Sequence, residues 1–84
     1  MRNGLIVLKN GTKYWYFNGK LHREDGPASI RADGSMAWYL NDQLHRINGP
    51  AIERADGIKF WYLNGEQVDP IVHFVRRSEF IEAI

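Results

Sequence analysis

Two His-Arg pairs are the residues of this chain best suited to chemistry. His22-Arg23 and His45-Arg46 stand 23 residues apart in a sequence of 84 residues. A histidine can give or take a proton near neutral pH, and an arginine can hold a phosphate through its fork of N–H groups. Together, these side chains could support a His-dependent hydrolysis of a phosphodiester, with one histidine exchanging protons and the arginines binding the phosphate.

Their repetition favours a structural explanation instead. Equivalent positions in a hairpin array lie two strands apart, roughly 10 Å for a strand spacing of ~4.8 Å, which is too far for two histidines to ligate one metal ion. We therefore expect each histidine to hydrogen-bond within its own hairpin. Each arginine is expected to pack over a tyrosine or to pair with an acid such as Glu24 or Glu53. No catalytic, cofactor-binding or metal-ligating residue is predicted, and the chain is expected not to be an enzyme.

The 23-residue spacing extends through most of the sequence. Trp15, Trp38 and Trp61 define it, and many other positions recur with the same period. They are Gly11/Gly34/Gly57, Tyr16/Tyr39/Tyr62, Asn18/Asn41/Asn64, His22/His45, Arg23/Arg46, Gly26/Gly49, Pro27/Pro50 and Ala28/Ala51. Self-similarity at this period is typical of stacked supersecondary units, each of which buries its apolar face against the next.

Within a unit, the residue types indicate strands and tight turns. Lys13 to Phe17 is aromatic and runs into Asn18-Gly19, which readily adopts the two positive φ angles of a type I′ hairpin turn. The return segment, Lys20 to Arg31, is interrupted at Glu24 to Pro27, where glycine permits a bend and proline removes a ladder donor. The segment can thus pair backward first and forward afterwards. We predict a mainly β fold, a single twisted antiparallel meander of 23-residue hairpin repeats.

The chain is expected to form one domain, residues 1–84, because so few residues cannot enclose a second core. Its predicted parts are an N-terminal edge strand (1–10), repeat 1 (11–33), repeat 2 (34–56), a truncated repeat 3 (57–69) and a C-terminal capping α-helix (70–84). Asp69 is a good N-cap and Pro70 a good first residue for this helix.

The spacing of apolar residues in this segment predicts how the helix packs. Ile71, Phe74 and Val75 are expected to face the tryptophan side of the sheet, with Arg76 and Arg77 outside.

Alternation along the strands assigns two faces to the sheet. The tryptophans share one face with Phe17, Leu40 and Leu63, and we take this face as the core. The opposite face is rich in tyrosine and is expected to be flanked by arginine, a mixture enriched where binding energy concentrates. The resulting candidate binding surface is Tyr14, Tyr16, Arg23, Tyr39, Arg46 and Tyr62, with His22 and His45 as secondary candidates. The alternative is that these tyrosines only cover the second side of the sheet.

The string from Trp15 to His22, with Gly26 and later Asp33-Gly34, resembles the MORN repeat, whose units are also about 23 residues long. The resemblance covers roughly residues 4–68 and is closest to a variant with a His-Arg-x-x-Gly-Pro-Ala element, as at 22–28 and 45–51. It implies a single twisted antiparallel sheet. Short variant arrays are also similar to families of antitoxins and small phage proteins. The resemblance therefore implies a small inhibitor or antitoxin-like role, as analogy from fold.

Charge and composition narrow the range of partners. Eleven basic and ten acidic residues leave a net charge of +1, so nucleic acid is not the expected partner. The absence of cysteine fits a reducing compartment, and the apolar run Leu5–Leu8 is too short for a signal peptide or a membrane span. We expect a cytoplasmic protein, in the host cytoplasm if the source is viral.

The first expectation for its partner is a protein, bound through the aromatic face or the N-terminal edge. The alternative is an anionic small molecule such as a nucleotide, bound by the tyrosines and arginines. No cofactor is expected. The Leu5–Leu8 edge is either covered by the C-terminal helix or free to pair with another chain. A homodimer through this edge or through the helix is a further candidate.

Overall fold

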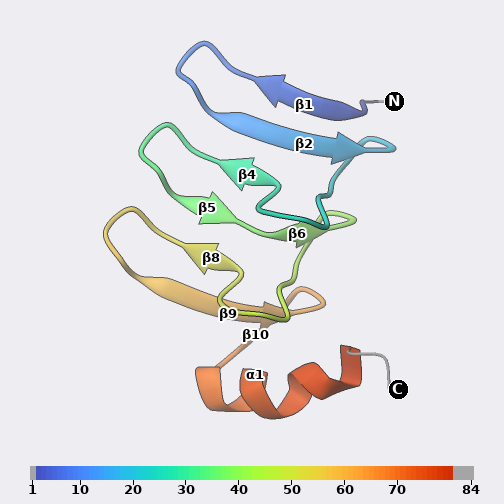
Figure 1. Cartoon of the computed structure of the whole chain (residues 1–84), viewed down its shortest axis with the longest axis vertical. Coiled ribbons are helices and arrows are strands. Elements are labelled where there is room, and N and C mark those ends of the chain that lie inside the picture. Colours follow the sequence, from blue (N-terminus) through green and yellow to red (C-terminus); the bar gives the residue numbers. More distant parts are fainter. Residues whose placement is uncertain (1, 81–84) are drawn as a thin grey trace.

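The computed structural model describes residues 2–80 of the chain. An antiparallel sheet descends strand by strand from the N-terminus to a C-terminal helix (Figure 1). Its strands are β1 (Gly4–Val7), β2 (Lys13–Phe17), β3 (Lys20–Leu21), β4 (Ser29–Ile30), β5 (Met36–Ala37), β6 (Tyr39–Leu40), β7 (Gln43–Leu44), β8 (Ile52–Glu53), β9 (Lys59–Leu63) and β10 (Glu66–Val68). An α-helix, α1 (Pro70–Arg76), continues into a 3-10 helix, η1 (Arg77–Phe80). The predicted mainly β meander with a terminal helix is confirmed.

The strands pair in chain order. Eight of them form one sheet in the order β1-β2-β4-β5-β8-β9-β10, with β3 paired to β2. The strands β6 and β7 form a small separate hairpin. Every pairing is antiparallel, and Ser29 in β4 stands opposite both Tyr14 in β2 and Ala37 in β5. The return segment thus pairs backward and then forward, as its sequence predicts.

The interruption in each return segment is organised around a tryptophan. The carbonyl of Trp15 accepts the His22 amide at 3.0 Å, and the Trp15 amide donates to the Ala28 carbonyl at 2.8 Å. The residues between these two partners leave the ladder and loop over the sheet. Trp38 holds the second return segment in the same way.

The hairpin turns have the predicted geometry. Asn18 and Gly19 have φ angles of 51° and 79°, so both central residues lie in the left-handed region that a type I′ turn requires. The third unit repeats this at Asn64-Gly65. In the second unit Asp42 takes the glycine position at φ 68°, and its carboxylate accepts the Leu21 amide at 2.6 Å.

Burial of the tryptophan face in this single-layer sheet is incomplete. The three tryptophans are only half-buried, whereas the fully buried apolar residues are Ala28, Ala51 and Leu63. Each alanine is bonded through its carbonyl to the amide of a tryptophan, Ala28 to Trp15 and Ala51 to Trp38, and described residues form no second layer over either face. Ala28 and Ala51 therefore stand opposite Trp15 and Trp38, and Leu63 follows Trp61 by two positions in β9, so the fully buried apolar residues lie on the predicted tryptophan face, although the indoles themselves are only half-buried.

The helix begins as predicted but packs differently. The Asp69 carboxylate accepts the Val72 amide at 2.9 Å, and Pro70 is the first helical residue. The helix packs on β9 at the end of the array and does not run along the tryptophan face (Figure 1). Its buried residue is His73, which bonds the Arg46 carbonyl through Nε2, and Ile71 and Phe74 are 77% and 66% exposed. The predicted inward apolar stripe is therefore wrong, because this polar anchor sets the rotation of the helix.

The helical end of the chain is described only in part. The predicted helix extends to residue 84, and residues 81–84 lie outside the described part. Among residues 2–80, no helix is long and apolar enough to cross a membrane.

Candidate functional site

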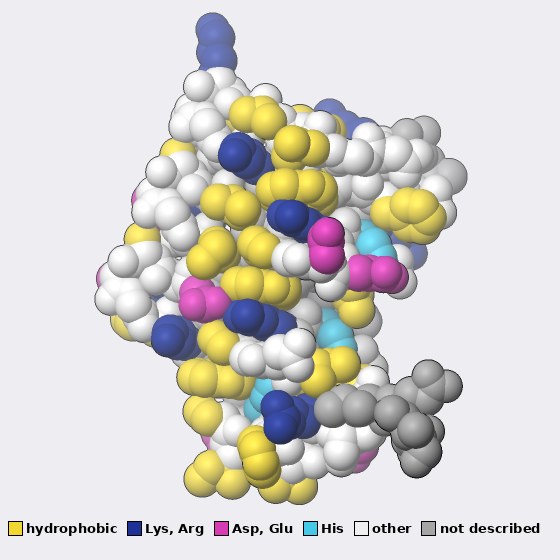
Figure 2. Space-filling model, viewed as in Figure 1, with side chains coloured by type: hydrophobic (Ala, Val, Ile, Leu, Met, Phe, Trp, Pro, Cys, Tyr) yellow, Lys and Arg dark blue, Asp and Glu magenta, His cyan; other side chains and the backbone are white. Residues whose placement is uncertain are grey.

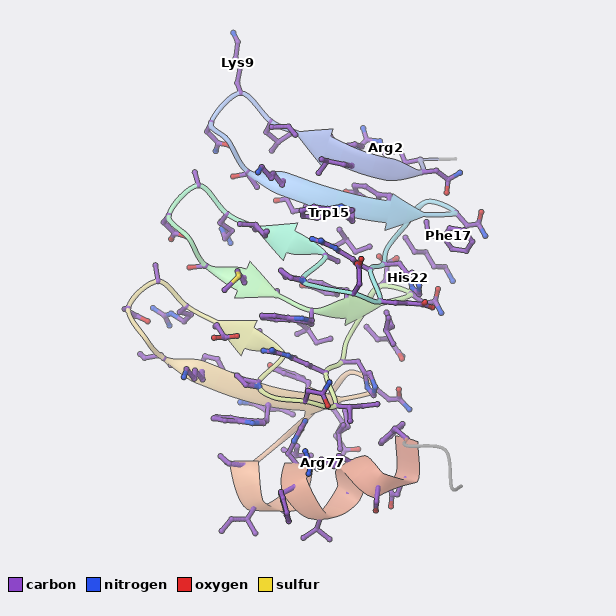
Figure 3. All side chains as sticks on the ribbon, in the orientation of Figure 1. Arg2, Lys9, Trp15, Phe17, His22 and Arg77 are labelled. Carbon is purple, nitrogen blue, oxygen red and sulfur yellow. The ribbon has the colours of Figure 1, made fainter. Side chains whose placement is uncertain are left out.

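The arginines of the two His-Arg pairs stack on tryptophans. The Arg23 guanidinium carbon lies 4.0 Å from the centroid of the Trp15 ring, and that of Arg46 lies 3.7 Å from the Trp38 ring. In Figure 2, Lys and Arg side chains alternate with hydrophobic ones down the middle of the viewed face, and Figure 3 marks Trp15 and Arg77 along this column. The arginines therefore belong to the tryptophan face, and the expected packing over tyrosine is wrong.

Each stacked arginine is also fixed by polar contacts. Arg23 donates to the Pro27 carbonyl at 3.2 Å and pairs with Asp25 at 2.9 Å. Arg46 donates to the Pro50 carbonyl at 3.1 Å and pairs with Glu53 at 2.8 Å. The expected pair with Glu53 is thus confirmed, whereas Asp25 takes the place expected for Glu24.

The glycine of the His-Arg-x-x-Gly-Pro-Ala element makes room for this stacking. A Cβ at Gly26 would lie 2.9 Å from the Arg23 guanidinium carbon, and one at Gly49 would lie 3.2 Å from that of Arg46. Neither glycine has a positive φ. The chain bends at both glycines, as the sequence predicts, and the missing side chain in addition leaves space for the guanidinium group.

The histidines join one unit to the next. His22 Nδ1 accepts the amide of Asn41 at 3.0 Å, and His45 Nδ1 accepts the amide of Asn64 at 2.9 Å. Each acceptor reaches the hairpin turn of the following unit, so the expected bond within one hairpin is wrong. Burial lowers the pKa of His45 from its ordinary value, and the neighbouring charge of His73 lowers it further. A neutral ring with Nδ1 free to accept is the form this contact needs.

The side chains of both His-Arg pairs therefore make structural contacts within the protein. A hollow of ≈ 560 Å³ lies between the two His-Arg loops and is lined by both arginines, Trp38 and His45. Both guanidinium charges there are paired with carboxylates, and Glu24 lies beside Asp25 as a second carboxylate in the lining. Among residues 2–80, no three His, Cys, Asp or Glu side chains gather as a metal site.

The tyrosines gather on the opposite face. Tyr14 pairs with Ser29, Ser29 with Ala37, and Ala37 with Ile52, so strand pairing carries this face across the units. Tyr14, Tyr16, Tyr39 and Tyr62 are all half-buried. Burial raises the pKa of Tyr39, and the neighbouring Tyr14 and Tyr62 raise it further. Three tyrosines of three different units therefore form one cluster, which we call the tyrosine face.

Other arginines than those predicted accompany this cluster. A second hollow, of ≈ 370 Å³, lies beside Tyr39 and includes Arg31, Arg54 and Ser35 in its lining. Arg31 forms no ion pair within residues 2–80, while Arg54 pairs with Asp56 at 2.8 Å. The predicted surface is thus divided: its tyrosines lie together, and Arg23 and Arg46 lie on the other side of the sheet. The 23-residue spacing of Arg31 and Arg54 is the signal that could have identified them.

Comparison of the chain with protein-family models, with curated proteins and with solved structures finds no significant match.

Proposed function

We propose that this chain is a non-enzymatic protein-interaction module that binds its partner through the tyrosine face. The observation that carries the proposal is the cluster of Tyr14, Tyr39 and Tyr62 on one side of a single-layer sheet. Within residues 2–80, no element packs over this side. Tyrosine supplies a large rigid contact area with a polar tip, which is why it is enriched in binding surfaces.

The contacts of the His-Arg pairs support a binding role over a catalytic one. Each histidine accepts a turn amide of the next unit, and each arginine stacks on an indole of its own unit, so both kinds of side chain are engaged in structural contacts. A hydrolase would need one of them directed at a substrate. Resemblance to variant MORN arrays adds a small inhibitor or antitoxin-like role, as a phage-type factor acting in the cytoplasm.

A face-specific pair of variants tests the proposal. Tyr39→Thr with Tyr62→Thr removes two rings from the tyrosine face, and Phe17→Thr with Lys59→Thr changes two exposed side chains on the other face. Immobilised wild-type chain and the two variants are exposed to lysate of the source cell, and captured proteins are quantified. We expect the tyrosine variant to lose proteins that wild type and the control both retain. Circular dichroism verifies that each variant is folded. Equal capture by a folded tyrosine variant would contradict the proposal.

The hollow beside Tyr39 favours a second candidate function, binding of an anionic small molecule such as a nucleotide. Arg31, without an ion pair among the described residues, provides the charge, and the Tyr39 ring provides a stacking surface for a base. A ligand at 100 times its dissociation constant should stabilise the chain by about 2.7 kcal/mol. A thermal-shift panel of nucleotides against wild type and Arg31→Ala measures this. No shift for wild type, or an equal shift for both, would exclude this site.

A further inference from the structure

The strand β1 presents an unpaired edge. It pairs on one side with β2, with Leu5 opposite Trp15 and Val7 opposite Lys13. Trp15 directs its amide and carbonyl toward Ala28 and His22, away from β1. In an antiparallel ladder, opposite residues that do not bond each other point their backbone groups outward. The amides and carbonyls of Leu5 and Val7 therefore face away from β2, and no other described strand lies there (Figure 3).

The strands equivalent to β1 in the other units show that this position can pair with a strand on each side. Residues 5–7 of β1 stand 23 positions before residues 28–30, which include β4, and 46 before residues 51–53, which include β8. The strand β4 pairs with β2 and β5, and β8 pairs with β5 and β9. Both β4 and β8 are thus paired on two sides. Of these three equivalent strands, only β1 has a side without a partner among the described residues.

This edge lacks the devices that usually prevent edge pairing. Proteins protect edges with proline, lysine, bulges or a covering helix. The four strand residues Gly-Leu-Ile-Val carry no charge and no proline, and Leu5 and Val7 are 50% and 55% exposed. The helix α1 packs on β9 at the opposite end of the array, so it does not cover β1. Of the two alternatives for this edge, only pairing with another chain agrees with these contacts.

We propose that β1 pairs with β1 of a second copy of this chain, antiparallel, about a two-fold axis that passes between the two Ile6 residues. In this register Leu5 of one copy stands opposite Val7 of the other, and the reverse. Each such pair exchanges two backbone hydrogen bonds, because these are the residues with outward amides and carbonyls. The two sheets then become one continuous sheet, with both tyrosine faces on the same side.

Self-complementarity is the argument for a second copy rather than an unrelated strand. The same register places Lys9 opposite Asn3 and Arg2 opposite Asn10, so no two like charges face each other. Leu5 and Val7 of the two copies form apolar pairs on one face, and the two Ile6 side chains meet on the other. Centring the axis on Val7 would place Lys9 opposite Leu5, and centring it on Leu5 would place Asn3 opposite Val7. Both lose apolar pairs and hydrogen bonds.

The proposed contact joins two strands of four residues each, so we expect a weak dimer whose population rises with concentration. Sedimentation velocity of the 84-residue chain from micromolar to millimolar concentration should show a monomer–dimer equilibrium. Amide hydrogen exchange supplies the register. The Leu5 and Val7 amides should exchange more slowly as concentration rises, whereas the Ile6 amide, which points toward Tyr14, should be protected at every concentration.

Matched variants at this edge complete the test. Val7→Pro removes one outward amide and no bond to β2, and Val7→Thr retains that amide and the branched shape. We expect the proline variant to be monomeric and the threonine variant to dimerise. Leu5→Lys with Val7→Lys keeps every backbone group and should prevent the dimer by setting lysines opposite lysines, so the test does not depend on proline being tolerated. A wild-type monomer at every concentration, or a dimer that survives these changes, would overturn the proposal.

Discussion

The imidazole of His45 accepts the backbone amide of Asn64, 19 residues further along the chain, at 2.9 Å. His22 accepts the amide of Asn41 in the preceding pair of units. In the first turn the side-chain oxygen of Asn3 accepts the amide of Asn18 at 2.7 Å. The turns at Asn18, Asn41 and Asn64 thus donate the same amide to a side-chain acceptor outside their own hairpin, and this contact adds to the strand pairing that joins successive units.

The use of asparagine in the first of these contacts suggests a test of the other two. His45→Asn should keep an acceptor near the Nδ1 position, whereas His45→Ala leaves the Asn64 amide without one. We expect the asparagine variant to be more stable than the alanine variant by about 1 kcal/mol, the net value of a typical hydrogen bond. Urea unfolding measures the difference. Equal stabilities would show that ring packing against Phe80, 5.0 Å away, accounts for the whole role of His45.

The lowered pKa of His45 predicts an acid-sensitive fold. In the unfolded chain this ring titrates near 6.5, and in the folded chain burial and His73 hold its pKa lower. The folded state therefore binds the proton less readily. Its stabilising contribution is complete above pH 6.5 and is lost as the pH falls from 6.5 toward the folded pKa. His45→Asn should flatten the unfolding free energy between about pH 7.5 and about pH 5. An unchanged slope would assign the acid sensitivity to other groups.

Much of the fold could be predicted because it depends on strictly periodic residues. The tryptophan spacing gives the unit, and Asn18-Gly19 gives the turn, since few other dipeptides accept two positive φ angles. Faces can be assigned only inside strands, where side chains alternate. Arg23 stands outside any strand, so alternation gives no basis for placing it, and its predicted face is wrong. The rotation of α1 could not be predicted for a related reason, because it depends on a bond between His73 and the Arg46 carbonyl that no spacing reveals.

The space above Gly26 predicts a coupling with Arg23. An alanine Cβ at this position would displace the guanidinium from Trp15 and lower the free energy of unfolding by about 0.5–1 kcal/mol. It would also lower the conformational entropy of the unfolded chain, which raises the free energy of unfolding by a similar amount. Gly26→Ala alone should therefore be nearly neutral. In an Arg23→Ala background the clash is gone, and Gly26→Ala should stabilise by about 0.4–1 kcal/mol.

A control for this cycle lies in the turn at Gly34, where φ is 94° and no atom lies within 4 Å of a built Cβ. Gly34→Ala should destabilise by about 1–2 kcal/mol in both backgrounds, because its cost is backbone strain. Thermal or urea unfolding of the set measures the coupling. Equal effects of Gly26→Ala with and without Arg23 would contradict the proposed role of this glycine.

The two stacked arginines differ in one respect that predicts unequal contributions to stability. The carboxylate paired with Arg46 is that of Glu53, whose side chain is 28% exposed, whereas the Asp25 side chain paired with Arg23 is 87% exposed. Truncating Arg46 leaves a half-buried carboxylate without its partner, while truncating Arg23 leaves one in water. We expect Arg46→Ala to destabilise the chain by about 1 kcal/mol more than Arg23→Ala.

The repeat supplies the control for this comparison. The position of Glu53 is occupied in the preceding unit by Ile30, which is also half-buried. Glu53→Ile should therefore make the second unit resemble the first, and in that background Arg46→Ala should cost no more than Arg23→Ala. Urea unfolding of wild type, the three single variants and the Glu53→Ile/Arg46→Ala double variant measures both differences. If the excess cost of Arg46→Ala persists without Glu53, the closer approach of Arg46 to the Trp38 ring, rather than the half-buried ion pair, is what distinguishes the two units.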